Sequence, residues 1–300
     1  MKIQRLCVPL FLVFSLAFLQ VQAQIQTDTT QLWQIELQNE NTYIGKIISR
    51  DSETIVFDSQ ELGIINIQVQ NIKSMKAIKA SQIREGAYWA ENPQSTRYFW
   101  SPTGYGLRKG DGYYQNVWIF FNQFSVGISD NTSIGVGFMP LFLFAGASTP
   151  VWITPKVSVP VSEQFNVGAG ALLGGILGED TDGPFGIAYG TATLGTRDQN
   201  LTLGLGYGFA GGEWANVPTI NISGMIRTGK KGYFLTENYL IDTGDDLLVL
   251  LLVGGRVVWP KIALDYGALL PLGADIDSFV AIPWLGISIP FGKKTPSVQE

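Results

Sequence analysis

Histidine is absent from all 300 residues, and the one cysteine, Cys7, lies within the first 23 positions. A chain without histidine cannot form a serine–histidine catalytic pair or a histidine-ligated metal centre. A single cysteine cannot form an intrachain disulfide, and its setting, QRLC at residues 4–7, does not fit a lipoprotein attachment site. No carboxylate pair or serine–lysine pair is arranged for acid–base chemistry, so the sequence predicts no enzyme and no cofactor.

Long apolar runs are also missing after residue 23. The longest, LLVLLLV at 247–253, is far shorter than the roughly 18 residues that a membrane-spanning helix needs. The first residues differ: a basic MKIQR, an apolar stretch at 6–19 and the small-residue ending VQA are typical of a signal peptide. The sequence therefore predicts a signal peptide at 1–23 and export of the remaining chain.

The chain has no strong charge of either sign, because 20 basic and 25 acidic residues give a net charge of −5. This mildly acidic balance disfavours nucleic acid as a partner. Composition changes along the chain: only three of the 35 glycines precede residue 100, whereas 15 of the 45 charged residues lie between Asp28 and Glu91. We therefore expect two different kinds of structure in succession.

Residues 24–80 are predicted to form a small antiparallel β-barrel of about five strands, followed by a linker or short helix up to residue 94. Short β-branched runs at 43–48, 54–57 and 64–69 alternate with polar turn clusters. The stretch IGKI at 44–47, with Asp51 in the next turn, resembles the Sm-like and SH3-like small barrels. The arginine–glycine pair of that family is missing, so we expect a periplasmic docking module for a protein partner, or a small folded module without a site.

Residues 95–292 show the pattern of a transmembrane β-barrel. Segments of about 10 to 14 residues alternate between apolar and small or polar side chains, and short connections alternate with longer ones. The fold class predicted is all-β: an antiparallel transmembrane β-barrel of about twelve strands with a small N-terminal β-barrel module. An even strand number puts both ends in the periplasm, and 293–300 is expected to be a disordered tail. The expected strands are 96–101, 115–128, 133–144, 151–160, 165–177, 185–196, 200–210, 218–227, 233–241, 247–258, 261–271 and 278–291.

Glycine alternates with bulky residues in LTLGLGYGFAGG, residues 201–212. In a lipid-embedded barrel the bulky residues of this stretch face the acyl chains, and the glycines leave room inside for side chains from other strands. The same alternation predicts an apolar inner wall, which does not suit a general porin. Its expected members are Met139, Leu141, Leu143, Leu248, Leu250, Leu252, Ile282 and Trp284.

Three stretches of the barrel region resemble an uncharacterised outer-membrane β-barrel family of Gram-negative bacteria. They are STRYFWSPTGYGLRKGDGYYQN at 95–116, ITPKVSVPVSEQFNVGAG at 153–170 and LGLGYGFAGGEW at 203–214. The resemblance implies a fold and an outer-membrane location, with lipid and lipopolysaccharide as surroundings, and it implies no activity.

Two sets of charged residues are candidates for function. The first set lies within predicted strands and is expected to pair locally or lie near a rim, or else to face the lumen: Arg97, Lys156, Glu237, Arg256 and Asp265. The last four of these are the candidate lumen charges. The second set lies in the longer, outer connections and is a candidate loop cation site, because carboxylates are ligands for hard divalent ions: Asp180, Asp182, Asp245 and Asp246. The alternative for the second set is that acidic residues only keep the loops solvated.

The sequence favours an outer-membrane barrel of unknown cargo that binds or passes a small hydrophobic solute. Two alternatives remain open at this point. One is a structural or surface-interaction barrel whose N-terminal module docks to a periplasmic protein. The other is a secreted, soluble all-β protein.

Overall fold

The structure is a computed structural model that describes residues 31–78, 80–84, 86–144, 148–178, 183–242, 244, 246–273 and 279–292. The predicted signal peptide and tail lie outside the described residues, as do Asp180, Asp182 and Asp245. Across the part of the chain that is described, no helix is long and apolar enough to cross a membrane.

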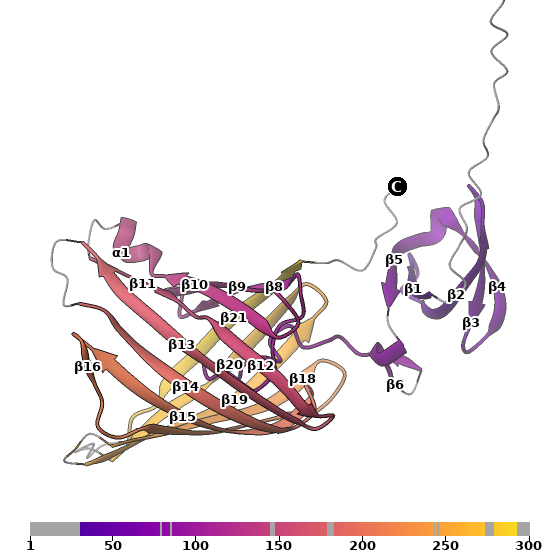
Figure 1. Ribbon diagram of the computed structural model, residues 1–300. Helices are drawn as coiled ribbons and strands as arrows, with labels where there is room; N and C mark the ends of the chain where they lie inside the picture. Colours follow the sequence, from indigo (N-terminus) through magenta and orange to yellow (C-terminus); the bar gives the residue numbers. More distant parts are fainter. Residues whose placement is uncertain are drawn as a thin grey trace, which may run out of the picture.

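The N-terminal part is one sheet of five antiparallel strands in the order β4-β3-β2-β1-β5, as Figure 1 shows in indigo and violet. Its core contains Trp33, Ile35 and Phe57. Gly45 is required for close strand packing, because a Cβ atom there would lie 2.0 Å from the Asp58 carbonyl oxygen. The five predicted strands are therefore present. They are β1 (Leu32–Leu37), β2 (Thr42–Arg50), β3 (Thr54–Ser59), β4 (Gly63–Gln68) and β5 (Ile72–Ile78), with a 3-10 turn η1 (Val69–Asn71) before β5.

The turn between β2 and β3 is fixed by Asp51. Its Oδ1 atom accepts hydrogen bonds from the backbone N–H groups of Glu53 (2.8 Å) and Thr54 (2.7 Å). These bonds favour the ionised carboxylate and hold the pKa of Asp51 below its usual value. The sequence predicts a turn at Asp51, and the Asp51 side chain stabilises this turn.

The C-terminal part is a closed antiparallel barrel of twelve strands, because β21 pairs with β8 from Gly286↔Val117 to Gly292↔Asp111. One of the twelve is interrupted: β11 and β12 both pair with β10 on one side and β13 on the other. A two-residue strand, β16 (Glu213–Trp214), extends the edge of β15. The barrel strands are β8 (Asp111–Val117), β9 (Phe121–Gly127), β10 (Thr132–Phe138), β11 (Thr149–Ile153), β12 (Lys156–Ser162), β13 (Phe165–Leu177), β14 (Phe185–Gly195), β15 (Gln199–Ala210), β17 (Thr219–Arg227), β18 (Gly232–Asp242), β19 (Leu247–Trp259), β20 (Ile262–Leu272) and β21 (Ile282–Gly292).

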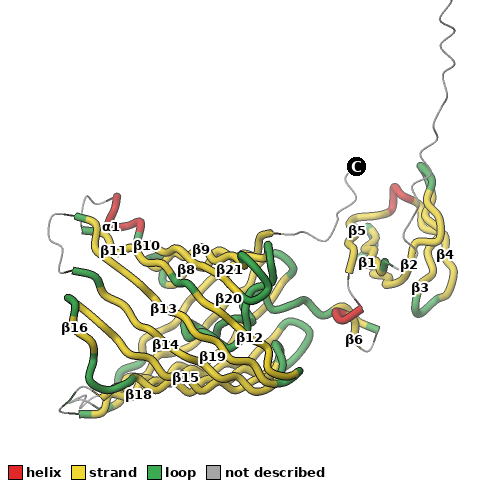
Figure 2. Tube along the Cα trace, viewed as in Figure 1, coloured by secondary structure: helices red, strands yellow, loops and turns green. Residues whose placement is uncertain are grey.

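The two rims of the barrel differ in their connections (Figure 2). We call the rim where β8 begins and β21 ends the near rim; its turns are short, at 128–131, 163–164, 196–198, 228–231 and 260–261. The opposite, far rim has the longer connections, one of which contains helix α1 (Pro140–Phe144). The chain enters at the near rim through η2 (Ala80–Gln82), β6 (Ile83–Arg84) and β7 (Ala87–Tyr88), so the predicted linker is a small hairpin.

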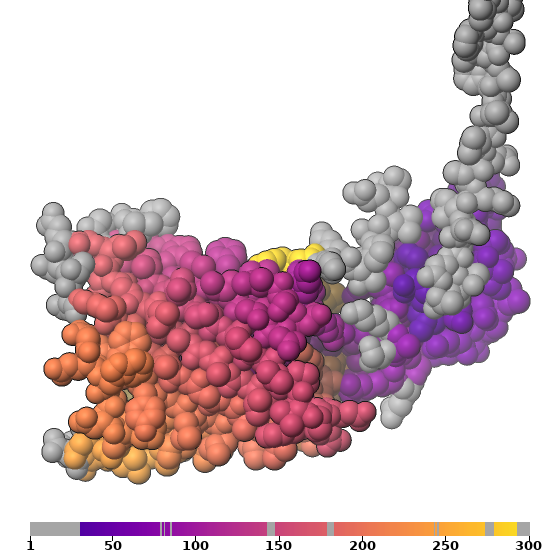
Figure 3. Space-filling model, in the orientation of Figure 1, coloured from indigo at the N-terminus to yellow at the C-terminus, as the bar shows by residue number. Residues whose placement is uncertain are grey.

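The outside of the barrel is apolar. On β15, Leu201, Leu203 and Leu205 are 56%, 52% and 50% exposed, whereas Thr202 and Gly204 between them are buried, which confirms the predicted faces. The atoms of neighbouring strands form a continuous wall on the face that Figure 3 shows. An exterior of this kind is suited to acyl chains and not to water. Other outward-facing members are Val157, Val159, Ile222, Ile226, Phe234, Val253, Tyr266, Leu285 and Ile289.

Two strand predictions are wrong, but the two errors offset each other, so the predicted number of barrel strands is still correct. Residues 96–101 are not a strand but lie inside the barrel, and residues 115–128 form parts of two strands, β8 and β9, rather than one. The predicted outer connection at 102–114 is consequently wrong as well. A third strand, predicted at 133–144, ends at Phe138; residues 140–144 form α1, where Leu141 is exposed rather than on the inner wall.

Candidate functional site: a closed lumen with an apolar cavity

Residues 92–108 fill the near half of the lumen, and we call them the lumen segment. The segment folds back on itself, since the Tyr98 N–H donates to the Ser101 carbonyl and the Thr103 N–H donates to the Thr96 carbonyl, both at 2.9 Å. Tyr98, Phe99 and Thr103 are completely shielded from solvent. The near half of the barrel is therefore closed by the protein's own chain.

Arg256 and Asp265, on β19 and β20, lie in the lumen opposite each other. The Arg256 Nε–Asp265 Oδ1 and Nη2–Oδ2 distances are 2.6 and 2.8 Å. The same guanidinium donates to the carbonyl oxygens of Gln94 (3.0 Å) and Tyr98 (2.6 Å). The ion pair thus holds the lumen segment to the barrel wall as well as joining two strands.

Lys156, on β12, holds the segment from the other side. Its Nζ atom lies 2.6 Å from the Thr103 carbonyl oxygen, 2.5 Å from that of Tyr105 and 3.4 Å from that of Thr96. Among the described residues, no carboxylate lies within 4.0 Å of this ammonium group. Its partners are the backbone carbonyls of the lumen segment.

Glu237, on β18, is buried beneath the tip of the segment. Its carboxylate accepts hydrogen bonds from the Trp100 N–H (2.9 Å) and the Tyr239 hydroxyl (2.7 Å). The four candidate lumen charges therefore lie in the lumen, around the same segment. The fifth charge that the sequence places in a strand, Arg97, belongs to the segment itself. The common partner of the four, residues 92–108, was not foreseen.

Neutral polar side chains complete the contact between the segment and the wall. The Tyr98 hydroxyl donates to Asn200 Oδ1 (2.6 Å), and the Gly104 N–H donates to Thr193 Oγ1 (2.7 Å). Gly104 has no room for a side chain, because a Cβ atom would lie 2.4 Å from the Asn166 carbonyl oxygen. The sequence did contain a signal for this polar region. Small polar residues occupy buried inner positions in several strands: Ser158, Asn166, Thr191, Thr193, Asn200, Thr202, Asn221, Ser223 and Ser288.

A second cluster fixes the entry of the chain at the near rim. Asp198 accepts hydrogen bonds from Arg227 (3.1 Å), the Tyr233 hydroxyl (2.6 Å) and Arg84. The Trp89 ring lies between two guanidinium groups, 5.0 Å from that of Arg84 and 4.9 Å from that of Arg227. The residues before the lumen segment are therefore bound to the barrel turns.

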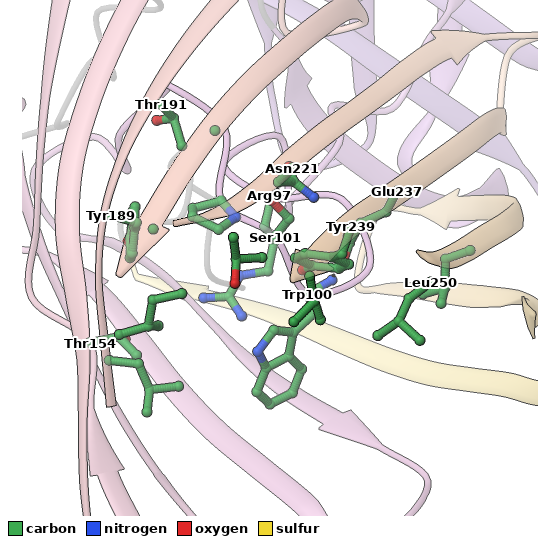
Figure 4. A pocket seen from close by; sticks show the side chains of 18 of the residues that line it. Arg97, Trp100, Ser101, Thr154, Tyr189, Thr191, Asn221, Glu237, Tyr239 and Leu250 are labelled. Atoms are coloured by element: carbon green, nitrogen blue, oxygen red, sulfur yellow. Dashed lines mark hydrogen bonds between the residues drawn. The ribbon is translucent and has the colours of Figure 1, made fainter. Parts of the chain in front are cut away.

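The far half of the lumen contains a cavity of about 460 Å³ above the lumen segment (Figure 4). Its floor includes Arg97, Trp100 and Pro102 of the segment. Leu250, Leu252 and Trp284 line it as predicted. Its other apolar and aromatic lining residues are Val117, Trp118, Phe121, Leu172, Ile187, Tyr189, Leu205, Tyr239, Ile241 and Leu269.

The aromatic residues of the cavity pack against one another. Trp118 and Trp284 have ring centroids 4.8 Å apart, and Trp100 and Phe121 have theirs 5.6 Å apart in an edge-on arrangement. Trp284 also contacts Phe99 of the lumen segment at 5.6 Å. The predicted apolar lumen is thus open as a cavity in the far half only. The near half is filled by the lumen segment, which makes polar contacts and also packs Phe99 against Leu235 and Val258 in one buried apolar cluster.

The candidate loop cation site is not tested by the described residues. Asp180, Asp182 and Asp245 lie outside them, and Asp246 is exposed beside the start of β19. Within the part of the chain that the structure describes, no group of three or more acidic side chains is placed to hold a metal ion.

Comparison with known proteins assigns no family to the chain. No family model matches it, and no curated protein matches it in sequence. Among solved structures, the KdgM porin has a TM-score of 0.43 with 10% identity, over 61% of this chain and 98% of that chain. The NanC porin has a TM-score of 0.38 with 12% identity, over 61% and 99%. OmpT of Vibrio cholerae has a TM-score of 0.33 with 10% identity, over 88% and 95%.

Proposed function

We propose that the protein is an outer-membrane β-barrel that binds a small hydrophobic solute in the far half of its lumen. The observation that carries this proposal is the division of the lumen into a near half filled by residues 92–108 and a far half with an apolar cavity of about 460 Å³. Cavities of this size with apolar walls and a few polar groups are typical of small-molecule sites.

The orientation follows from the rims. Barrels of this kind have short turns on the periplasmic side and longer loops outside. The near rim, which carries the short turns, the N-terminal module and the C-terminal end of β21, is therefore assigned to the periplasm, and the cavity faces the cell exterior. In this arrangement the N-terminal module is available to a periplasmic protein.

Two alternatives fit the structure less well. A soluble all-β protein would expose the leucines of β15 to water, which is costly for so large an apolar surface. A general porin needs a polar, water-filled lumen, whereas this lumen is closed by the lumen segment. We assign no reaction to the cavity, because its carboxylate, Glu237, is already engaged by Trp100 and Tyr239.

The test is to fill the cavity from one glycine and compare it with an outward-facing glycine on the next strand. A Cβ atom at Gly204 would point inward and lie 3.4 Å from its nearest neighbour, the Asn221 Cβ atom, whereas one at Gly190 would have nothing within 4 Å. Gly204→Leu therefore places a side chain inside the cavity and reduces its free volume. Gly190→Leu, whose side chain would point away from the lumen, is the matched control. The probe is N-phenylnaphthylamine, a neutral apolar fluorophore, with the protein in lipid nanodiscs and empty nanodiscs subtracted.

We expect saturable binding to the wild-type protein, weakened about tenfold or more by Gly204→Leu, since overfilling an apolar site costs about 1–3 kcal/mol. Gly190→Leu is expected to bind as the wild type does. Absence of saturable binding to the wild type, or equal effects of the two substitutions, would overturn the proposal.

A further inference from the structure

We infer that the ligand of the cavity is a single-chain amphiphile with a monoanionic head group, and that Arg97 binds this head group. The inference rests on the proposed function, because it names the chemical class that the same cavity takes. It is carried by the position and the unsatisfied bonding of one guanidinium group.

Arg97 belongs to the lumen segment and lines the floor of the cavity. In Figure 4 its guanidinium group lies between Thr154 and Trp100, directed toward the open centre of the view. Its Nη1 atom donates to Gln115 Oε1 at 2.9 Å, and its Nε atom is buried without a hydrogen-bond partner. Among the described residues, no carboxylate oxygen lies within 4.0 Å of it.

The other charges of the lumen differ from Arg97 in this respect. Arg256 is paired with Asp265, and Glu237 accepts bonds from a backbone N–H and a hydroxyl. Lys156 is saturated by three carbonyl oxygens on the near side of the segment. Among the charged residues that the structure describes in the lumen, Arg97 is thus the cation whose N–H donors are not all hydrogen-bonded.

An arginine of this kind has a purely structural alternative. Its guanidinium carbon lies 5.6 Å from the centroid of the Tyr113 ring, and this contact together with the Gln115 bond would hold it in place without a ligand. A structural role, however, leaves a buried N–H donor without an acceptor, which costs about 1–3 kcal/mol. The Nη2 group has no hydrogen-bond partner among the described residues and is not shielded as Nε is, so an anion in the cavity would accept from Nη2. A carboxylate matches the planar fork of the guanidinium group.

The walls determine the rest of the ligand. Above Arg97 the cavity is lined by aliphatic side chains such as Leu250, Leu252 and Leu269, with the Trp284 ring beside them. These surfaces bind a hydrocarbon chain by excluding water. One unpaired cation, with the Glu237 carboxylate already in the wall, favours a head group with a single negative charge. A neutral or cationic head group would leave Arg97 unsatisfied.

The experiment measures binding of radiolabelled dodecanoic acid to the full-length protein in nanodiscs, at a pH well above neutral, with empty nanodiscs subtracted. Unlabelled dodecanol and dodecyltrimethylammonium, which share the chain and differ in the head group, compete against it. We expect dodecanoate to displace the label at a concentration about tenfold or more below that of either competitor, because bonds to a charged partner add about 1.5–3 kcal/mol. Equal competition by dodecanol would overturn the inference and leave the proposed function standing.

Arg97→Gln is the matched variant, because it keeps a polar side chain and removes the charge. We expect it to weaken dodecanoate binding about tenfold or more and to change binding of the uncharged N-phenylnaphthylamine severalfold less, because that probe makes no ionic bond. Arg108→Gln is the control, since Arg108 lies on the same segment but is half exposed beside Glu91 at the near rim. If Arg97→Gln binds dodecanoate as the wild type does, Arg97 is structural and the inference is wrong. If neither probe binds the wild-type protein, the proposed function itself fails.

Discussion

Arg256 and Asp265 form a two-point ion pair inside the barrel, with both side chains closed to solvent and with N–O distances of 2.6 and 2.8 Å. The two residues face each other across β19 and β20, in the near-rim half of the ladder that joins these strands. Arg256 also donates hydrogen bonds to the carbonyl oxygens of Gln94 and Tyr98. The ion pair therefore contributes both to the pairing of β19 with β20 and to the position of the lumen segment.

Asp265→Asn is expected to lower the free energy of unfolding by about 3–5 kcal/mol, because it leaves the Arg256 charge buried without its counter-ion. Reversible urea unfolding in lipid vesicles measures the change. The double variant Arg256→Met with Asp265→Leu should lose less than the single variant, since it removes both charges. An Asp265→Asn protein that unfolds at the wild-type urea concentration would show that the pair contributes little.

Lys156→Met is expected to increase the ion conductance of the barrel. The wild-type protein should conduct poorly, because residues 92–108 fill the near half of the lumen. Without the ammonium group, the carbonyls of Thr96, Thr103 and Tyr105 lose their common donor, which costs about 1–3 kcal/mol for each buried group left unpaired. Planar-bilayer recording is the measurement, and Lys231→Met, in an exposed near-rim turn, is the control. A large wild-type conductance would contradict the closed lumen. Equal conductance of the two variants would show that the Lys156 ammonium group does not hold the segment in place.

The alternation of β15 shows why the barrel class could be predicted from the sequence. Leu203 faces outward and Gly204 inward because side chains on a strand alternate between faces, and only a lipid exterior places the bulky side chains outside. The predicted number of twelve strands is correct for a less secure reason. The turn between β8 and β9 contains no glycine, proline or asparagine, and Trp118 and Ile119 instead adopt positive φ angles of 51° and 69°. Such residues rarely form turns, so the sequence pattern predicts one continuous strand at 115–128.

The lumen segment could not be predicted from alternation. Its sequence TRYFWS, residues 96–101, has the aromatic pattern of a strand, but its rings contact Trp284 and Phe121 inside the barrel rather than lipid. Burial against protein and burial in lipid select the same side chains, so the pattern alone cannot separate the two. The charges at Lys156 and Arg256 were found because a charge within a strand stands out, whereas their backbone partners carry no sequence signal.

Leu203→Arg is expected to destabilise the barrel by about 2–4 kcal/mol, and Leu177→Arg by about 0–1 kcal/mol, if the apolar exterior lies in a bilayer. Leu203 is in the middle of β15, whereas Leu177 is the last residue of β13 at the far rim; both are more than half exposed. Unfolding in lipid vesicles gives the two values. Equal effects at the two depths would indicate that the exterior does not face a bilayer.

Asp198→Asn is expected to release the residues that lead into the lumen segment. It removes the charge that binds Arg84, Arg227 and the Tyr233 hydroxyl at the near rim. Hydrogen exchange of residues 86–91, followed by mass spectrometry, should become faster. Asp242→Asn, at the far end of β18, is the control and should leave these rates unchanged. Wild-type exchange in Asp198→Asn would mean that Trp89 alone fixes the entry of the chain.

Gln94→Met is expected to stabilise the protein by about 1 kcal/mol, although it removes a polar side chain from the lumen segment. The Gln94 side chain is 0% exposed, and neither its Oε1 nor its Nε2 atom has a hydrogen-bond partner, so it bears a desolvation cost of about 1–3 kcal/mol without compensation. Methionine has a similar length and volume, and the contacts of the Gln94 backbone with Asn92 and Arg256 do not depend on the side chain. Urea unfolding in vesicles measures the gain, and Gln115→Met is the opposing control, because its amide binds Arg97 and the Phe99 carbonyl and its loss should destabilise. A Gln94→Met protein less stable than the wild type would show that the amide has a partner in the folded state.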